Sequence, residues 1–368
     1  MKEKSCSNCR AMFLTDQLVE FDGLALCDEC LSNQTVLCSH CGERIWRDDN
    51  AGSFQFPLCQ GCYDEHYTCC THCGRLIHYD NAYYEDDCDD EPFCYECHEN
   101  NAADERVIKD YYYKPTPIFY GKGGRFFGVE LEVDEAGEYD DSAESIMDIA
   151  NAKAEHIYCK HDGSLDSGFE IVTHPMTLDY HKNNMPWADI LDKLKRMGYL
   201  SHLASTCGLH VHVNRDSLGE TREDQDACIA RILYFVEKHW EELLKFSRRT
   251  PRQLQRWAAR YGYKEHPKEI LDNAKAGAGN GRYSCVNLEN SSTIEFRMFR
   301  GTLKLNTIIA TLQLVNRVCD VAFALSDEEI KNMSWTTFVS GCKEPELVLY
   351  LKERRIYINE PITCEEDL

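Results

Sequence analysis

The sequence predicts an α+β protein in which three small cysteine-rich modules precede a larger domain built on a curved sheet with packed helices. Three observations lead to this fold class. Cysteine pairs crowd the first 100 of the 368 residues, and later strand-like segments carry polar side chains on one face only. Amphipathic helical segments lie between those strands, so we predict that the second part of the chain forms a sheet on which helices pack.

Composition and charge exclude several classes of protein. The chain is 43% hydrophobic and 11% aromatic, which is enough to bury a sizeable core. It contains no run of 18 apolar residues and no apolar stretch near its start, so we expect neither a transmembrane helix nor a secretory signal. The 40 basic and 63 acidic residues give a net charge of −23. This balance argues against a nucleic-acid-coating surface and favours a cytoplasmic protein with no membrane partner.

The cysteines form an internal repeat. Twelve of them make six C-x-x-C pairs, and the first cysteines of alternate pairs recur every 32 residues. Two such pairs supply the four thiolates of a tetrahedral zinc ion, so we predict three zinc-ribbon-like modules of four cysteines each at 6–30, 38–62 and 70–97. The predicted zinc ligands are Cys6, Cys9, Cys27 and Cys30, then Cys38, Cys41, Cys59 and Cys62, then Cys70, Cys73, Cys94 and Cys97.

Other uses of C-x-x-C pairs fit less well. A thioredoxin-type redox pair needs a βαβ setting, and a disulfide framework needs an oxidising compartment. Iron–sulfur ligation stays open on spacing alone. Units of about 32 residues cannot fold on apolar burial alone, and zinc worth on the order of 10–16 kcal/mol per site would supply the missing stability. Because residues 1–100 carry six basic and 20 acidic residues, we expect protein docking or a structural role rather than nucleic-acid binding.

Four later segments alternate with a period of two residues, which is typical of strands with one polar face. In the first, Phe127, Val129, Leu131 and Val133 alternate with Gly128, Glu130, Glu132 and Asp134. The polar positions of the other three are Glu170 and His174; His210, His212 and Asn214; and Glu295 and Arg297, with Lys160 and Asp162 just upstream of Glu170. Any one segment is explained by an ordinary exposed strand, but together they indicate a polar concave sheet surface.

The residue types on this surface point to a particular chemistry. Glutamates and histidines without cysteine suit a hard cation such as Mg²⁺ or Mn²⁺. Interspersed arginine and lysine suit a phosphate-bearing ligand. The combination predicts a metal–nucleotide site at which a phosphoryl group is transferred.

Helices are expected at 141–156, 185–197, 221–246 and 306–325, and Ser326 with Glu329 forms a capping box for a further helix. A basic stretch covers 248–260 and contains five arginines. It is either a surface for phosphate or an acidic substrate, or a solvated helix face, and the sequence leaves both interpretations open.

At 128–134, 160–177, 208–214 and 282–306 the sequence resembles the amidoligase family of carboxylate–amine ligases. That family is related in fold to glutamine synthetase and glutamate–cysteine ligase, so the resemblance implies a curved antiparallel sheet. The last segment is also similar to the glutamine synthetase strand in which an E-x-R motif supplies a metal ligand and a phosphate-binding arginine.

The resemblance implies roles for individual residues. The implied ligands of Mg²⁺ or Mn²⁺ are Glu130, Glu132, Glu170, His212 and Glu295. The implied catalytic cations are Arg297, Lys160 and Arg300. By the period of two, Arg300 belongs to the apolar face of its strand, so its role requires the strand to end or bulge near Phe299. Further candidates for substrate or nucleotide contacts are Asp162, His210, Asn214 and Arg282.

The implied activity is ATP-dependent amide formation through an acyl phosphate. The implied partners are ATP, a carboxylate substrate and an amine substrate, and a peptide or protein is among the candidate substrates. The expected domains are the zinc repeats at 1–100, a linker and lead-in strand at 101–124, the amidoligase-like domain at 125–345, and a C-terminal helix and tail at 346–368. Two alternatives remain: a phosphotransferase on the same scaffold, and a non-catalytic protein that binds partners through its zinc modules.

Overall fold

The computed structural model describes residues 3–85, 88–98 and 106–358, which form two compact units. The first unit comprises Met1–Asp104 with Tyr112–Pro115, and the second comprises Glu105–Tyr111 with Thr116–Leu368. Parts of the expected linker, 101–105, and of the expected tail, 359–368, lie outside the described residues.

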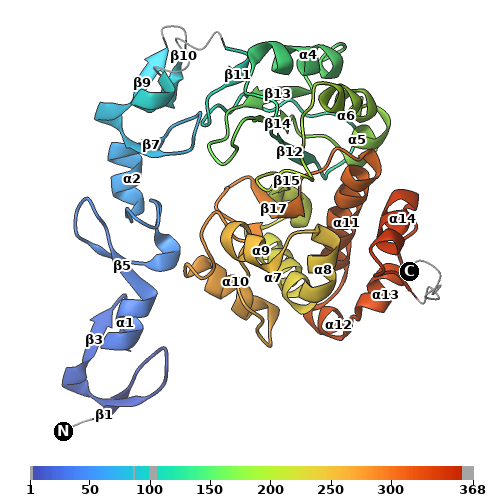
Figure 1. The fold of residues 1–368 in the computed structure, drawn as a ribbon. Coiled ribbons are helices and arrows are strands. Elements are labelled where there is room, and N and C mark those ends of the chain that lie inside the picture. The colour runs from blue at the N-terminus through green and yellow to red at the C-terminus, as the bar shows by residue number, and fades with distance from the viewer. Residues whose placement is uncertain (1–2, 86–87, 99–105, 359–368) are drawn as a thin grey trace. The chain divides into compact units, whose positions relative to one another are not determined.

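Each cysteine-rich repeat begins with a two-stranded antiparallel hairpin, and a short 3-10 turn follows it. Figure 1 labels the first strand of each hairpin, β1, β5 and β7. The hairpins are β1 (Glu3–Ser5) with β2 (Met12–Leu14), β5 (Thr35–Leu37) with β6 (Arg44–Trp46), and β7 (Tyr67–Cys69) with β8 (Leu76–His78). The remaining elements are β3 (Leu18–Phe21), β4 (Leu24–Cys27), α1 (Asp28–Gln34), α2 (Gln60–His66), β9 (Tyr83–Glu85) and β10 (Cys88–Phe93).

The turn inside each hairpin has the same backbone conformation in all three repeats. Arg10, Gly42 and Gly74 follow the first C-x-x-C pair of each repeat and have φ angles of 60°, 76° and 69°. Their N–H groups donate to the carbonyl oxygens of the first cysteines at 3.0, 2.9 and 2.8 Å. This left-handed residue closes the turn and brings the two cysteines together, so the 32-residue sequence period is also a structural period.

A seven-stranded sheet is the centre of the second unit, in the order β11-β13-β14-β12-β15-β17-β16. Its strands are β11 (Ile108–Lys109), β12 (Phe127–Val133), β13 (Ile157–Lys160), β14 (Phe169–Thr173), β15 (Gly208–Asn214), β16 (Val286–Asn287) and β17 (Thr293–Arg300). All neighbours are antiparallel except β11 and β13, which run parallel. The expectation of a wholly antiparallel sheet is therefore wrong at this edge, because β12 and helix α4 (Asp140–Ala150) supply the long connection that a parallel pair needs.

Helices pack on the apolar face of the sheet, and the apolar side chains of both form one core. Besides α4 the helices are α5 (Leu178–Asn183), α6 (Trp187–Arg196), α7 (Arg222–Lys238), α8 (Trp240–Ser247), α9 (Pro251–Trp257), α10 (Pro267–Lys275), α11 (Leu305–Ala324), α12 (Asp327–Asn332), α13 (Trp335–Ser340) and α14 (Pro345–Glu353). One long helix was expected at 221–246, but it is two helices. The chain leaves helical geometry at the buried His239, whose φ and ψ are −104° and 30°. The predicted capping box at Ser326 and Glu329 is confirmed.

Helix α11 has the length and apolar composition of a membrane span, although its sequence contains no unbroken apolar run of 18 residues. In its most apolar window, 72% of the residues are buried inside the protein. The helix contacts α5, α6, α7 and α14, so its apolar character is explained by its place in the core.

Candidate active site and metal centres

Polar side chains from five neighbouring strands lie on the sheet face opposite the helix-packed core. They are next to one another because the register of the strands places them in cross-strand pairs. These pairs are Lys160–Glu170, Glu170–Glu132, Glu130–His210 and His212–Glu295. Side chains that are up to 135 residues apart in the sequence therefore form one continuous polar row.

Glu130 is at the centre of this row. Its carboxylate oxygens lie 3.0 Å from His212 Nε2 and 3.2 Å from His210 Nδ1. Glu130, His212 and Glu295 form one group whose ligand atoms lie within 4.8 Å of one another, and Glu130, Glu170 and His210 form a second. Because both groups combine carboxylate oxygens with an imidazole, their donors fit divalent cations such as Mg²⁺ or Mn²⁺. The structure thus places His210 among the carboxylates, whereas the sequence suggested that it contacts the substrate or nucleotide.

Burial and neighbouring charge act differently on the acids of this face. Burial opposes ionisation of Glu130, but His212 and His210 outweigh it and hold the pKa of Glu130 well below its ordinary value. Burial alone would lower the pKa of His212, whereas Glu130 and Glu295 raise it. For Glu170, burial raises the pKa well above its ordinary value, and the charge of Glu130 adds to the shift. Glu170 is therefore the carboxyl group that most needs a cation in order to ionise.

Changing Glu170 to Gln should stabilise the protein at alkaline pH when Mg²⁺ is absent. Between the ordinary carboxyl pKa of 4.5 and the raised pKa of folded Glu170, the folded protein holds a proton that the unfolded chain releases. The free energy of unfolding therefore falls as pH rises through that window, and glutamine removes the loss. Urea unfolding at pH 8 and pH 4 measures the effect. The gain should be present at pH 8, absent at pH 4, and absent from the control Glu144→Gln on an exposed position of α4. A variant that is less stable at pH 8 would contradict the prediction.

Basic side chains lie beside the acids. Arg297 Nη1 donates to Glu295 Oε1, and Arg297 Nε is buried without a hydrogen-bond partner among the described residues. Lys160 Nζ lies 3.8 Å from Glu170 Oε2 and is also buried. These two cations lie on β13 and β17, at opposite ends of the acidic row, so the row has a positive charge at each end.

A bulge in β17 decides where Arg300 lies. Leu209 of β15 is opposite Phe299 and Val211 is opposite Phe296, so two residue steps on β15 span three on β17. The extra residue reverses the alternation and sets Arg300 opposite Gly208, on the polar face. The bulge near Phe299 that a role for Arg300 requires is therefore present. Arg300 Nε is buried without a hydrogen-bond partner among the described residues.

Arg249 is a further basic residue of this face that the sequence did not single out. It is only 9% exposed, and its Nε donates to the Phe299 carbonyl oxygen at 3.1 Å. A side chain at Gly208 would collide with Arg249 Nη2 and with His210 Nε2, so glycine makes room for the guanidinium. The Gly208 N–H also donates to Glu132 Oε2. Arg249 is therefore not part of a solvated helix face, and a surface for phosphate or an acidic substrate stays the prediction for this residue.

The remaining candidates are placed in different ways. The Asp162 carboxylate accepts the Ser164 N–H at 2.7 Å within a turn, and its charge contributes to the raised pKa of Glu170. Asn214 binds backbone groups instead, because its side chain accepts from the Phe126 N–H and donates to the Gly124 carbonyl oxygen. It lies at the end of β15 and fastens a loop.

Two further residues differ from what the sequence suggested. By the alternation along β12, Asp134 belongs to the polar face. Its carboxylate instead accepts hydrogen bonds from the Ser167 N–H and the Thr206 hydroxyl, each at 2.6 Å, and so fixes the loops that contain these two residues. Asn287 was not predicted, and its side-chain amide donates to Glu295 Oε2 at 2.9 Å. It lies inside the segment 282–306, but the two-residue strand β16 is too short for a recognisable alternation.

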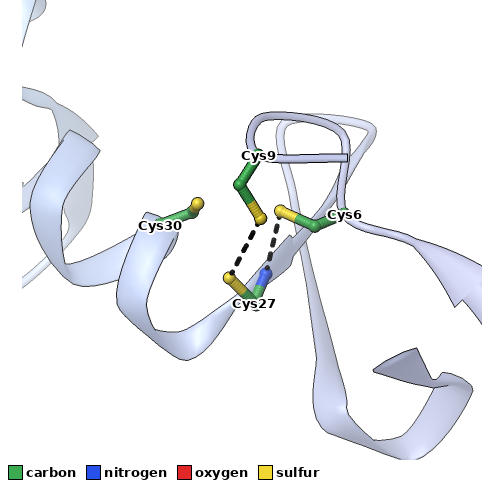
Figure 2. Close-up of side chains that lie close together, drawn as sticks. All are labelled: Cys6, Cys9, Cys27 and Cys30. Atoms are coloured by element: carbon green, nitrogen blue, oxygen red, sulfur yellow. Dashed lines mark hydrogen bonds between the residues drawn. The ribbon is translucent and has the colours of Figure 1, made fainter. Parts of the chain in front are cut away.

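The four cysteines of each repeat come together as predicted. In every repeat the sulfur atoms lie within 4.8 Å of one another, and Figure 2 shows the first set, in which Cys6, Cys9, Cys27 and Cys30 surround a common space. The Sγ–Sγ distances are 3.9 Å for Cys9–Cys27, and 3.9 and 3.7 Å for the equivalent pairs of the other repeats. Tetrahedral zinc with Zn–S bonds of about 2.3 Å separates its sulfurs by roughly 3.8 Å. The geometry therefore fits three zinc ions.

Without a metal, the thiols of one set cannot all ionise. Burial opposes ionisation of Cys6, but backbone N–H groups of Cys27, Cys9 and Asn8 lower its pKa to about 6. At Cys27 the N–H of Cys30 favours the thiolate, whereas burial and the neighbouring thiols prevail and raise the pKa to about 12. A divalent cation at the centre would remove this conflict, since it stabilises all four thiolates together.

Comparison with known proteins supports a ligase. None of the curated proteins matches the chain. One protein family does match, over a segment a little under half of the chain that contains Lys160, Glu170, both histidines of β15, Glu295 and the arginines of β17, but not Glu130 or Glu132. Residues 147–319 of this chain match the family described as "Putative amidoligase enzyme".

Proposed function

We propose that this protein is an ATP-dependent ligase that joins a carboxylate to an amine through an acyl phosphate. The observation that carries the proposal is the composition of one sheet face, where two carboxylate–imidazole groups share Glu130 and lie beside the buried cations Lys160 and Arg249 and the partly buried Arg297. Carboxylates bind divalent cations and arginines bind phosphate oxygens, so the face is complementary to ATP with its metal ions. The match to the amidoligase family over residues 147–319 supports the same reaction class.

In this proposal the substrate carboxylate attacks the γ-phosphorus of ATP, and ADP leaves. The amine nitrogen then attacks the acyl carbon and loses a proton, phosphate leaves, and an amide remains. Divalent cations held by Glu130, Glu132, Glu170, His212 and Glu295 would bridge the phosphates. Lys160, Arg297 and Arg300 would stabilise the negative charge that develops on the transferred group.

The proposal extends to the rest of the molecule. The sheet would be arranged as in glutamine synthetase. The site on its polar face would be closed and dry, so that water could not reach the acyl phosphate. The acidic zinc repeats would dock a basic peptide or protein substrate or another partner. Since twelve reduced thiolates are needed to hold three zinc ions, we place the protein in the reducing cytoplasm.

Phosphate release from ATP and Mg²⁺ tests the function. Zinc-replete protein is incubated with pooled amino acids, polyamines and peptides, and products are weighed by mass spectrometry. We expect release that depends on an added amine, with a product heavier by one condensation. Transfer of phosphate to a stable product without free phosphate would indicate the phosphotransferase instead. A protein that binds no ATP–Mg²⁺ would contradict both the ligase and the phosphotransferase hypotheses. The remaining hypothesis would be a non-catalytic protein that binds partners through its zinc modules.

A further inference from the structure

A group of basic side chains gathers where helix α8 ends, beside the last residue of β17. The residue after α8, Arg248, has φ and ψ angles of 61° and 12°, so the chain turns sharply there. Arg249 Nε donates to the Phe299 carbonyl oxygen at 3.1 Å, and Arg300 Nη1 donates to the Arg248 carbonyl oxygen at 3.5 Å. These two hydrogen bonds hold the two pairs of residues together, so the Arg300 guanidinium lies against the backbone of Arg248.

Helix α14 brings a third arginine to this place. Arg354 Nε donates to the Lys245 carbonyl oxygen at 3.0 Å, and the Tyr350 hydroxyl donates to the Phe246 carbonyl oxygen at 3.0 Å. Burial raises the pKa of Tyr350 to about 12, and the charges of Arg248 and Arg354 oppose the shift. Both arginines therefore lie near the Tyr350 hydroxyl at the end of α8.

His202 lies among the three arginines. Its Nδ1 is buried without a hydrogen-bond partner in the part of the chain that the structure describes. Burial lowers the pKa of His202 to about 4, and the charges of Arg248, Arg300 and Arg354 add to the shift. His202 is therefore neutral at pH 7, and one of its ring nitrogens carries a hydrogen that can be donated to an anion.

No carboxylate among the described residues pairs with any of the three arginines. The described ion pairs of the second unit that contain an arginine use other arginines. Glu353 is next to Arg354 in the sequence, but its carboxylate lies 3.0 Å from Lys304 Nζ. Burial lowers the pKa of Arg300, and the charge of Arg248 adds to the shift. Because like charges repel, an anion bound among the arginines would stabilise all three.

Backbone carbonyl oxygens use a small part of the donors in this cluster. Each guanidinium carries five N–H groups in a planar fork. The side chains of Arg300 and Arg354 each donate to one carbonyl oxygen, and Arg300 Nε is buried without a partner among the described residues. The remaining N–H groups can bind the oxygens of a phosphate group, which arginine forks match in geometry.

The cluster lies next to the acidic row on the same face of the sheet. The Gly208 N–H donates to the Glu132 carboxylate, and Gly208 is opposite Arg300, so Glu132 and Arg300 lie two strands apart. Neighbouring strands are about 4.8 Å apart, which places the two residues roughly 10 Å from each other across the sheet. A small molecule can therefore have one end in the cluster and the other end at the acidic row.

We propose that His202, Arg248, Arg300 and Arg354 form a binding site for a phosphate dianion, either orthophosphate or the phosphate monoester of a small molecule. Phosphate carries about two negative charges at pH 7, so it balances three guanidinium charges better than one carboxylate does. The five N–H groups of Arg300 allow it to serve this phosphate as well as the transferred group. That the phosphate belongs to a substrate of the amide-forming reaction rests on the proposed function, whereas the site itself does not.

Calorimetric titration with phosphate in a buffer without divalent cations tests the site. The probes are orthophosphate, glycerol 2-phosphate and acetate at equal ionic strength. Arg248→Gln and Arg354→Gln should each raise the Kd of both phosphates at least about tenfold, and the unchanged protein should bind acetate at least about tenfold more weakly than phosphate. If glycerol 2-phosphate binds at least as tightly as orthophosphate, the ligand is a phosphate monoester; if it binds more weakly, the ligand is free orthophosphate.

Two controls separate this site from general charge and from the acidic row. Arg252→Gln removes the same charge at an exposed position of α9, and Glu130→Gln changes the centre of the acidic row. Neither should weaken the binding of orthophosphate. An equal loss in Arg252→Gln, or no phosphate binding by the unchanged protein, would overturn the proposal. A loss in Glu130→Gln would place the phosphate at the acidic row and would also overturn it.

Thermal unfolding separates anion binding from a structural role. Because the arginine charges are unbalanced, Arg248→Gln should melt at a higher temperature than the unchanged protein in dilute buffer without phosphate. Phosphate should raise the melting temperature of the unchanged protein but not that of the variant. A variant that melts at a lower temperature and still gains stability from phosphate would overturn the proposal. A protein that binds phosphate but not ATP–Mg²⁺ would overturn the proposed function and support the anion site.

Discussion

Replacing Glu130 with glutamine is expected to lower amine-dependent phosphate release by at least about a hundredfold. Glu130 is shared by both carboxylate–imidazole groups, so the change removes a negative oxygen from each proposed cation site at once. It also leaves His212 and His210 without the carboxylate that lies 3.0 and 3.2 Å from them. An amide nitrogen donates hydrogen bonds where the carboxylate oxygen accepted them, and the glutamine side chain has nearly the same size.

The matched control is Glu138→Gln in the same unit. Glu138 pairs with His161 at 2.9 Å, but both side chains are more than a third exposed and neither belongs to the two groups that share Glu130. We expect its turnover and its melting temperature to stay unchanged. The measurement is the rate of phosphate release at saturating ATP and Mg²⁺, with circular dichroism to show that each variant is folded. Full activity in Glu130→Gln would contradict the proposed cation sites.

The purified protein should contain three zinc ions per chain, and Cys27→Ser should contain two. Apparent zinc binding in small modules is worth on the order of 10–16 kcal/mol, and the first module has little else to stabilise it. Its buried apolar cluster comprises Cys6, Leu26, Cys27, Cys30 and Leu31, three of which are predicted zinc ligands. The first module should therefore unfold when one ligand is lost. Elemental analysis gives the metal content, and limited proteolysis between residues 6 and 30 reports the unfolding.

Cys69 offers a control for this experiment. It precedes the ligand Cys70 directly but is exposed and belongs to none of the three sets. Cys69→Ser should retain three zinc ions and should resist protease as the unchanged protein does. Two zinc ions in Cys69→Ser, or iron in place of zinc in the unchanged protein, would contradict the assignment.

The sequence determined the features that depend on neighbouring residues. A C-x-x-C pair is closed by one local turn, and the spacing of 32 residues repeats that turn at Arg10, Gly42 and Gly74. The period of two along a strand determined that Glu130 and Glu132 share a face, because successive side chains point to opposite sides. The arrangement of the cysteine sets could be predicted for the same reason, since each set comes from a short continuous segment.

Only the tertiary structure decided which polar residues meet across the strands. The bulge that turns Arg300 to the polar face is set by the pairing of β15 with β17, whose residues are far apart in the chain. His210 lies among the carboxylates because of its register with Glu130, and Arg249 is buried because its guanidinium packs against Gly208. Register, bulges and loop packing follow from contacts between distant residues, and a local pattern fixes the face of a side chain but not its neighbours.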